Sequence, residues 1–140
     1  MPVGGKSTST ASKPARVKGK VRSLHNGQFI ETAVRHGGVR YWNMGHCAVI
    51  EEEHSTPDDL NLVLVTTERV TPMSVHQLVS CGIYPERQKI LVAKGTVAPR
   101  AAYEPVSAKV VLVDTPGTTS VNPKRFSFQR ARPGIWELSS

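Results

Sequence analysis

The sequence predicts an α+β fold in a single domain, with an antiparallel β meander followed by a compact strand–helix–strand–turn–strand unit in a mixed sheet. Two observations lead to this prediction. The first half alternates apolar and polar residues between glycine-containing turns, which is typical of half-buried strands. The second half contains near-continuous apolar runs separated by one helix signal. The chain has 140 residues, 39% of them hydrophobic, so the whole range 1–140 is long enough to bury its own core.

The elements of the predicted meander follow one another closely. Residues 17–24 alternate, with lysine and arginine on the outer face, and predict the first strand. Asn26-Gly27 is a strong signal for a two-residue hairpin turn, because such a turn requires positive φ angles. The remaining elements expected in this half are a returning strand over Phe29–Val34, a turn at Gly37-Gly38, and strands over Val39–Asn43 and His46–Ile50.

The second half is expected to form the mixed unit. Leu60–Thr67 predicts a strand covered on both faces, because its residues are almost all apolar. Thr71-Pro72 is a good helix start, and Gly82 suits the left-handed residue just after the helix end near Cys81. Two further strands are predicted over Lys89–Ala93 and Lys109–Asp114, with a short helix or turn over Ala101–Ala108.

The net charge of +7 is concentrated at the two ends of the chain. Residues 1–22 carry six lysines and arginines and no acidic residue, and they include a flexible Ser/Thr/Lys loop over 6–16. The tail 121–140 is also basic. The basic N-terminal region has no aromatic residue to stack on bases, so a nucleic-acid partner is not expected. No apolar run approaches the ~18 residues of a membrane span, and no secretory signal is visible, so we expect a cytoplasmic location and no membrane partner.

The cysteines and histidines do not form a recognisable metal or catalytic motif. Cys47 and Cys81 are too few for a disulfide framework, and we expect buried or inert thiols. None of the histidines has the spacing of a zinc motif, so no metal site and no catalytic residue are assigned to this chain: His25, His36, His46, His54 and His76.

One motif suggests a nucleotide hydrolase, but the rest of the sequence does not support this interpretation. VVLVDTPG, which ends in Asp114–Gly117, could place a carboxylate near magnesium. The matching phosphate loop would have to include Gly5-Lys6-Ser7, but only four residues precede Gly5, so the first glycine and the feeding strand of that loop are missing. The simpler interpretation of Asp114–Gly117 is a turn at the end of a strand.

Several blocks of the sequence, in order, resemble the C-terminal domain of the MlrC-like (microcystinase C, microcystin degradation) metallopeptidases. They are PVGGK, VKGKVRSLHNGQF, NMGHCAVI, LVLVTTERVTPMSVHQLVSCGIYPERQKILVAKGTVAPRAAYEP, VDTPGTT and the closing RARPGIWEL. The resemblance implies that a larger N-terminal domain, absent here, carries the catalytic zinc, and that the full enzyme is a hydrolase of amide bonds in peptide-like substrates. Two departures from the family pattern are the Ala98-Pro99-Arg100 step and the residues Gly134 and Glu137.

Within that resemblance, Lys94 and Arg100 are the candidate substrate-binding residues. Lys94 follows an apolar run, and Arg100 could hold a carboxylate with its planar guanidinium. The alternative is that both form ordinary ion pairs, with Glu104 or Asp114 as partners.

The expected function is that of a non-catalytic C-terminal domain or subunit that supports a zinc-containing catalytic domain and positions its substrate. The expected partners are that catalytic domain, supplied in trans, or further copies of this chain. The alternative is a protein-binding or assembly module, or a gene remnant, with no hydrolase partner.

Overall fold

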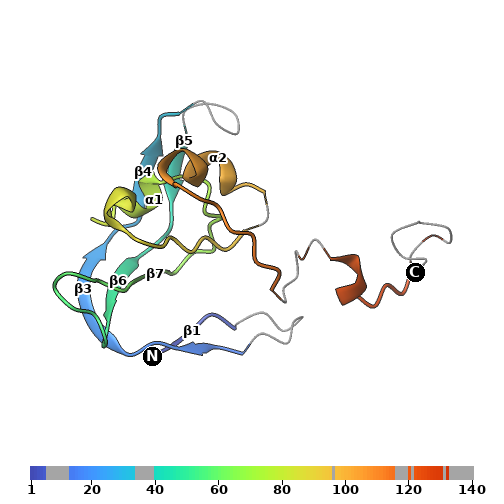
Figure 1. Cartoon of the computed structure of the whole chain (residues 1–140), viewed down its shortest axis with the longest axis horizontal. Helices are drawn as coiled ribbons and strands as arrows, with labels where there is room; N and C mark the ends of the chain where they lie inside the picture. The colour runs from blue at the N-terminus through green and yellow to red at the C-terminus, as the bar shows by residue number, and fades with distance from the viewer. Residues whose placement is uncertain are drawn as a thin grey trace.

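A long, bent two-stranded ribbon forms the centre of the protein. The computed structural model describes residues 1–5, 13–33, 40–95, 97–115, 120, 122–130 and 132. One arm of the ribbon consists of β3 (Gly19–His25) and β4 (Gln28–Glu31), and the other consists of β5 (Arg40–Asn43) and β6 (Cys47–Glu52). β3 pairs with β6 and β4 with β5, both antiparallel, and β7 (Leu62–Thr66) adds a third strand beside β6 (Figure 1).

The ribbon bends where glycines interrupt both arms. Gly27 and Gly45 have φ angles of 69° and 66°, which disfavour residues with a side chain. The Met44 N–H donates a hydrogen bond of 2.9 Å to the Gly27 carbonyl oxygen and so joins the arms at the bend. Asn26-Gly27 is therefore a corner, and the prediction of a hairpin turn there is wrong, because β3 pairs with β6 rather than with β4. The predicted turn at Gly37-Gly38 lies outside the described residues.

A second, small ribbon precedes the main one. β1 (Pro2–Val3) pairs antiparallel with β2 (Ala15–Arg16), and the Val17 N–H donates to the Met1 carbonyl oxygen at 2.9 Å. Most of the predicted loop 6–16, namely 6–12, lies outside the described residues.

The first helix is shorter than the sequence suggests. α1 (His76–Val79) begins five residues after Thr71; its N-cap residue Val75 makes no side-chain cap, and the Ser74 hydroxyl accepts a hydrogen bond of 3.0 Å from the His76 N–H. The Gln77 side chain holds the preceding loop in a non-helical form: its Nε2 donates to the Thr71 carbonyl at 3.1 Å, and its Oε1 accepts from the Ser74 N–H at 3.2 Å. The predicted helix end is confirmed. Gly82 has a φ angle of 73°, and the Ile83 N–H donates to the Leu78 carbonyl, which is a Schellman arrangement.

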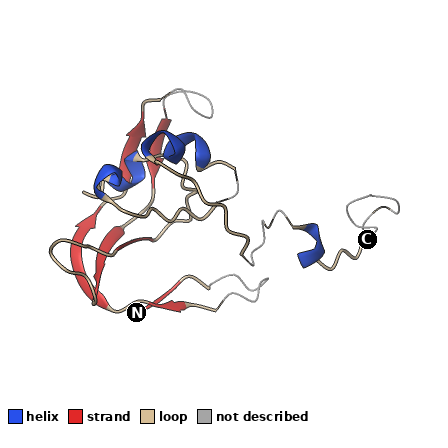
Figure 2. Cartoon of the chain, in the orientation of Figure 1, coloured by secondary structure: helices blue, strands red, loops and turns tan. Residues whose placement is uncertain are grey.

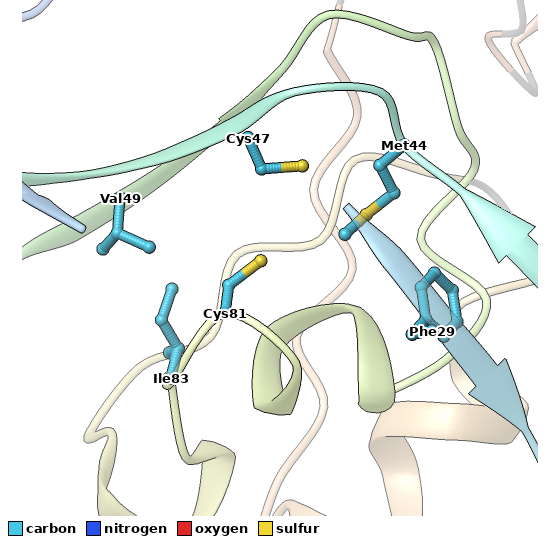
Figure 3. Close-up of a cluster of buried hydrophobic side chains, with 6 residues drawn as sticks. All are labelled: Phe29, Met44, Cys47, Val49, Cys81 and Ile83. Carbon is cyan, nitrogen blue, oxygen red and sulfur yellow. The ribbon is translucent and has the colours of Figure 1, made fainter. Parts of the chain in front are cut away.

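The core lies between β4, β6 and the turn that follows α1 (Figure 3). Phe29 and Trp42 face each other across β4 and β5 as stacked rings, 6.3 Å between centroids. The buried cluster consists of Phe29, Met44, Cys47, Val49, Cys81 and Ile83, with Trp42, Leu62, Leu64, Val70 and Leu78 packed against it.

After α1 the described chain contains only short helices and extended connections (Figure 2). The helices are η1 (Pro85–Arg87), α2 (Arg100–Tyr103), η2 (Glu104–Val106) and η3 (Pro123–Arg125), of which α2 and η2 agree with the predicted turn over 101–108. None of the helices in the described ranges has the length and apolar character needed to cross a membrane.

The predicted strands over Lys89–Ala93 and Lys109–Asp114 do not form. Both segments are apolar, but neither pairs with a strand of the described chain, and apolar character alone does not make a strand. All strand pairs of the described residues are antiparallel, so the predicted mixed sheet and strand–helix–strand–turn–strand unit are not observed. The coarser prediction of an α+β-like fold class is confirmed, since the structure consists of small antiparallel sheets with few helices.

Candidate functional site

The connection from Lys94 to Arg100 leads into α2 and contains both candidate substrate-binding residues. Pro99 is buried and begins the helical turn, accepting hydrogen bonds of 3.0 Å from the N–H groups of Ala102 and Tyr103. Ala102 is 1% exposed, so α2 presents this face to the protein interior. Proline before the helix suits this turn, because its φ angle is already helical.

Two contacts hold α2 against the rest of the protein. A Cβ added to Gly95 would lie 2.6 Å from Cγ of Pro99, so only glycine allows the chain to pass this close to the proline ring. The Tyr103 hydroxyl donates to the Ser74 carbonyl oxygen at 3.5 Å, which links α2 to the loop before α1. Burial raises the pKa of Tyr103, so its hydroxyl stays protonated and remains a donor at neutral pH.

Arg100 lies on the solvent side of α2 and is paired within the helix. Its Nη2 lies 3.1 Å from Oε1 and 3.4 Å from Oε2 of Glu104, one helical turn further along. Both side chains are about half exposed, so the pair adds little to stability and can open for another anion. The structure thus contains the Arg100–Glu104 ion pair, which the sequence indicated as the alternative to substrate binding by this arginine.

Lys94 is exposed at the end of the extended segment 88–95. No ion pair of its ammonium group occurs within the described residues, whereas Lys89 of the same segment binds Asp59 at 3.0 Å. Asp114, the other partner considered for these cations, binds Arg125 instead at 2.9 Å. The structure therefore leaves Lys94 open to solvent, and substrate binding by Lys94 and Arg100 stays a prediction.

Asp114 is held by groups that follow it in the chain. Arg125 donates to Oδ2 through Nε (3.1 Å) and Nη2 (2.9 Å), and the Ser120 hydroxyl donates to Oδ1 at 3.4 Å. Hydrogen bonding to Arg125 lowers the pKa of Asp114. The rest of the predicted turn, Pro116-Gly117, lies outside the described residues.

Of the described histidines, His25 and His76 each lie near a polar side chain. The His25 ring is hydrogen-bonded to the Ser23 hydroxyl at 2.8 Å, and Nδ1 of His76 lies 3.8 Å from the buried Glu31 carboxylate. His36 lies outside the described residues.

One group of possible metal ligands, Glu52, Glu53 and His54, occurs in the described part. Within this group, both oxygens of Glu52 accept hydrogen bonds of 2.8 Å, one from the backbone N–H and one from the ring of His54. The carboxylate raises the pKa of His54 and the imidazole lowers that of Glu52, as expected of an exposed ion pair in a turn.

The two cysteines are reduced and lie in the core. Both are 2% exposed, and Figure 3 shows their sulfur atoms pointing into the same space between β6 and the turn after α1. Burial, together with the neighbouring Cys81 thiol, raises the pKa of Cys47 to about 11. Their proximity has no local signal in the sequence, because 34 positions separate them.

Comparison with known proteins identifies the class of this domain. The family model described as MlrC C-terminus matches residues 1–130, which is most of the chain. The chain belongs to this family and is a C-terminal domain of MlrC-like proteins. No curated protein and no solved structure matches it.

Sequence reasoning missed the contacts that fix the candidate site in place. The Tyr103–Ser74 hydrogen bond and the packing of Gly95 on Pro99 join residues across loops, and no spacing rule predicts them. The Arg100–Glu104 pair could be found from the sequence, because residues four apart on a helix face each other.

Proposed function

We propose that this chain is a non-catalytic domain or subunit of an MlrC-like zinc metallopeptidase, which supports a catalytic domain and positions its substrate. The family match over residues 1–130 carries the proposal. The zinc, with the water it activates, belongs to the catalytic domain, which residues outside this chain provide. The substrate is a peptide-like amide, and microcystin-type cyclic peptides are the first to test.

The contribution of this chain is a rigid support that presents two cations. Lys94 follows an extended segment and points its charge into solvent, and α2 carries Arg100 on a turn packed through Pro99 and Ala102. A planar guanidinium binds a substrate carboxylate through two parallel hydrogen bonds, and an ammonium adds a second, less directional charge. Glu104 holds Arg100 in place until a substrate carboxylate replaces it.

The experiment compares the zinc-containing catalytic domain with and without this chain on an acidic peptide-like substrate. We expect this chain to bind the catalytic domain and to increase kcat/KM. Equal activity with and without it would overturn the supporting role.

Point variants then test the two cations separately. Lys94→Ala and Arg100→Ala are each expected to raise KM about tenfold, as the loss of one charged contact predicts. Lys89→Ala is the matched control, because Lys89 lies in the same extended segment but is engaged by Asp59. If both variants behave like Lys89→Ala, the positioning role of Lys94 and Arg100 fails while the supporting role stands.

A further inference from the structure

The segment Lys109–Asp114 exposes a continuous apolar run. It follows η2 and leads away from the body of the protein (Figure 1). The exposed fractions of Val110, Val111, Leu112 and Val113 are 40%, 70%, 74% and 74%. Four consecutive apolar side chains at this exposure are unusual for a monomer and typical of an interaction surface.

The backbone of this segment is also unpaired within the part of the chain that the structure describes. No main-chain hydrogen bond joins residues 109–114 to another part of the described backbone. The residues are mostly β-branched, which favours extended strands over helices. An extended, apolar segment with free N–H and C=O groups is a template for pairing with another strand.

The sequence KVVLVD is complementary to itself when two copies run antiparallel. Placing Lys109 opposite Asp114 of the second copy aligns Val110 with Val113 and Val111 with Leu112. The same charge pair then forms at both ends, as a two-fold axis requires. Opposite charges and β-branched pairs directly across from each other both stabilise antiparallel strands.

The charges also exclude the competing arrangement. Parallel, in-register stacking would place Lys109 opposite Lys109 and Asp114 opposite Asp114, and like charges directly opposite each other are destabilising. The segment therefore favours a closed pair over the open stacking of a fibre.

Asp114 can accept a second cation in this position. Its side chain is 42% exposed although Arg125 already binds it. The protein contains such an arrangement at Glu51, where Lys20 binds Oε1 and Arg22 binds Oε2, both at 2.9 Å. A carboxylate between two cations is thus compatible with the strand geometry of this chain.

We propose that two copies of this chain associate through an antiparallel strand pair formed by Lys109–Asp114 of each copy. The proposal rests on the segment alone and is independent of the hydrolase role proposed above. The second copy supplies a strand partner, which the sequence anticipates for this run and which it does not have among the described residues.

Sedimentation equilibrium of the full chain, from about 1 μM to about 500 μM, tests the association. We expect a monomer–dimer equilibrium, and amide hydrogens of residues 110–113 protected from exchange in the dimer. Val111→Lys should weaken the dimer at least about tenfold, because it places charge in the paired strands. Val92→Lys is the control, since Val92 is 93% exposed in the other extended segment and its replacement should leave the dimer intact.

Charge reversal tests the register. Lys109→Asp alone places two acidic residues at each end of the pair, and Asp114→Lys alone places two lysines there, so each variant should be monomeric. A mixture of the two variants restores opposite charges at both ends and should form a heterodimer. Arg125→Ala controls for the loss of the Arg125 contact in Asp114→Lys.

A chain that stays monomeric at every concentration would overturn the proposal, even if another protein covers the segment. A dimer that none of the Lys109, Val111 or Asp114 variants weakens would also overturn the proposal. The same holds if the mixture of Lys109→Asp and Asp114→Lys does not associate. Circular dichroism should be unchanged in all variants, because the replaced side chains are exposed in the single chain.

Discussion

The hydrogen bond from the Met44 N–H to the Gly27 carbonyl oxygen joins the two arms of the central ribbon where both of them bend. It connects residues 17 positions apart at the point where the pairing shifts by one residue, from His25 opposite Cys47 in β3–β6 to Gln28 opposite Asn43 in β4–β5. The bend brings Phe29 of β4 and Val49 of β6 into one core cluster. The folding of this domain therefore depends on the conformation of two glycines.

Gly27→Ala should destabilise the protein more than a change at another glycine of the same conformation. A Cβ at Gly27 would collide with the Gly45 carbonyl oxygen and lie 2.8 Å from the Cys47 sulfur, in addition to the strain of a positive φ angle. We expect a loss of at least about 2 kcal/mol in the free energy of unfolding, measured in urea.

Gly82→Ala is the matched control for this prediction. Gly82 has a φ angle of 73°, but nothing lies within 4 Å of its added Cβ, so only the strain of about 1–2 kcal/mol applies. Equal losses at Gly27 and Gly82 would mean that the crowded corner is unimportant.

Met44→Ala should remove the side chain that fills the centre of the core. Met44 is 1% exposed and packs with Phe29 and Cys47. The cavity left behind should cost about 2–5 kcal/mol in the free energy of unfolding. Val92→Ala, at a side chain that is 93% exposed, should stay within about 0.5 kcal/mol of the parent. If Met44→Ala lowers the free energy of unfolding by no more than about 0.5 kcal/mol, the Met44 side chain does not fill the core.

The strands of the ribbon could be predicted from the sequence because each has its own local pattern. Alternation over 17–24 corresponds to β3 (Gly19–His25), and the apolar run Leu60–Thr67 corresponds to β7 (Leu62–Thr66). Strand pairing could not be predicted in the same way. Asn26-Gly27 satisfies the conformational needs of a hairpin and of a corner equally, and only the long-range pairing of β3 with β6 decides between them.

The two failed strands have a different cause. Lys89–Ala93 and Lys109–Asp114 have the composition of strands, but a strand also needs a neighbour, and composition does not specify one. In the candidate site, the positions of Lys94 and Arg100 follow from local sequence, since one ends an extended run and the other begins a helix. Their surroundings do not follow from local sequence, because the hydrogen bond between Tyr103 and Ser74 joins residues that are 29 positions apart.

The thiols of Cys47 and Cys81 should be slow to react in the folded protein. Both are buried, and a pKa of about 11 for Cys47 leaves about one thiolate per thousand molecules at pH 8. We expect an aromatic disulfide reagent to label both thiols rapidly only in denaturant. Fast labelling of the native protein in buffer would show that the region between β6 and α1 opens readily.

Acid should weaken the protein partly through Glu51, which bridges Lys20 and Arg22 across β3 and β6. Hydrogen bonding to Lys20, followed by that to Arg22, lowers the pKa of Glu51 in the folded state. Its stabilising effect is therefore present above the ordinary carboxyl pKa of 4.5 and is lost as the pH falls through the lower folded-state value.

The double variant Lys20→Gln/Arg22→Gln should be less stable than the parent in urea at neutral pH, and this difference should shrink as the pH drops below about 4. Lys18→Gln, which removes a longer and more exposed contact with Glu53 (3.5 Å), should change the stability little at any pH. A difference between parent and double variant that persists unchanged in acid would assign the effect to the apolar packing of the two long side chains and not to the carboxylate.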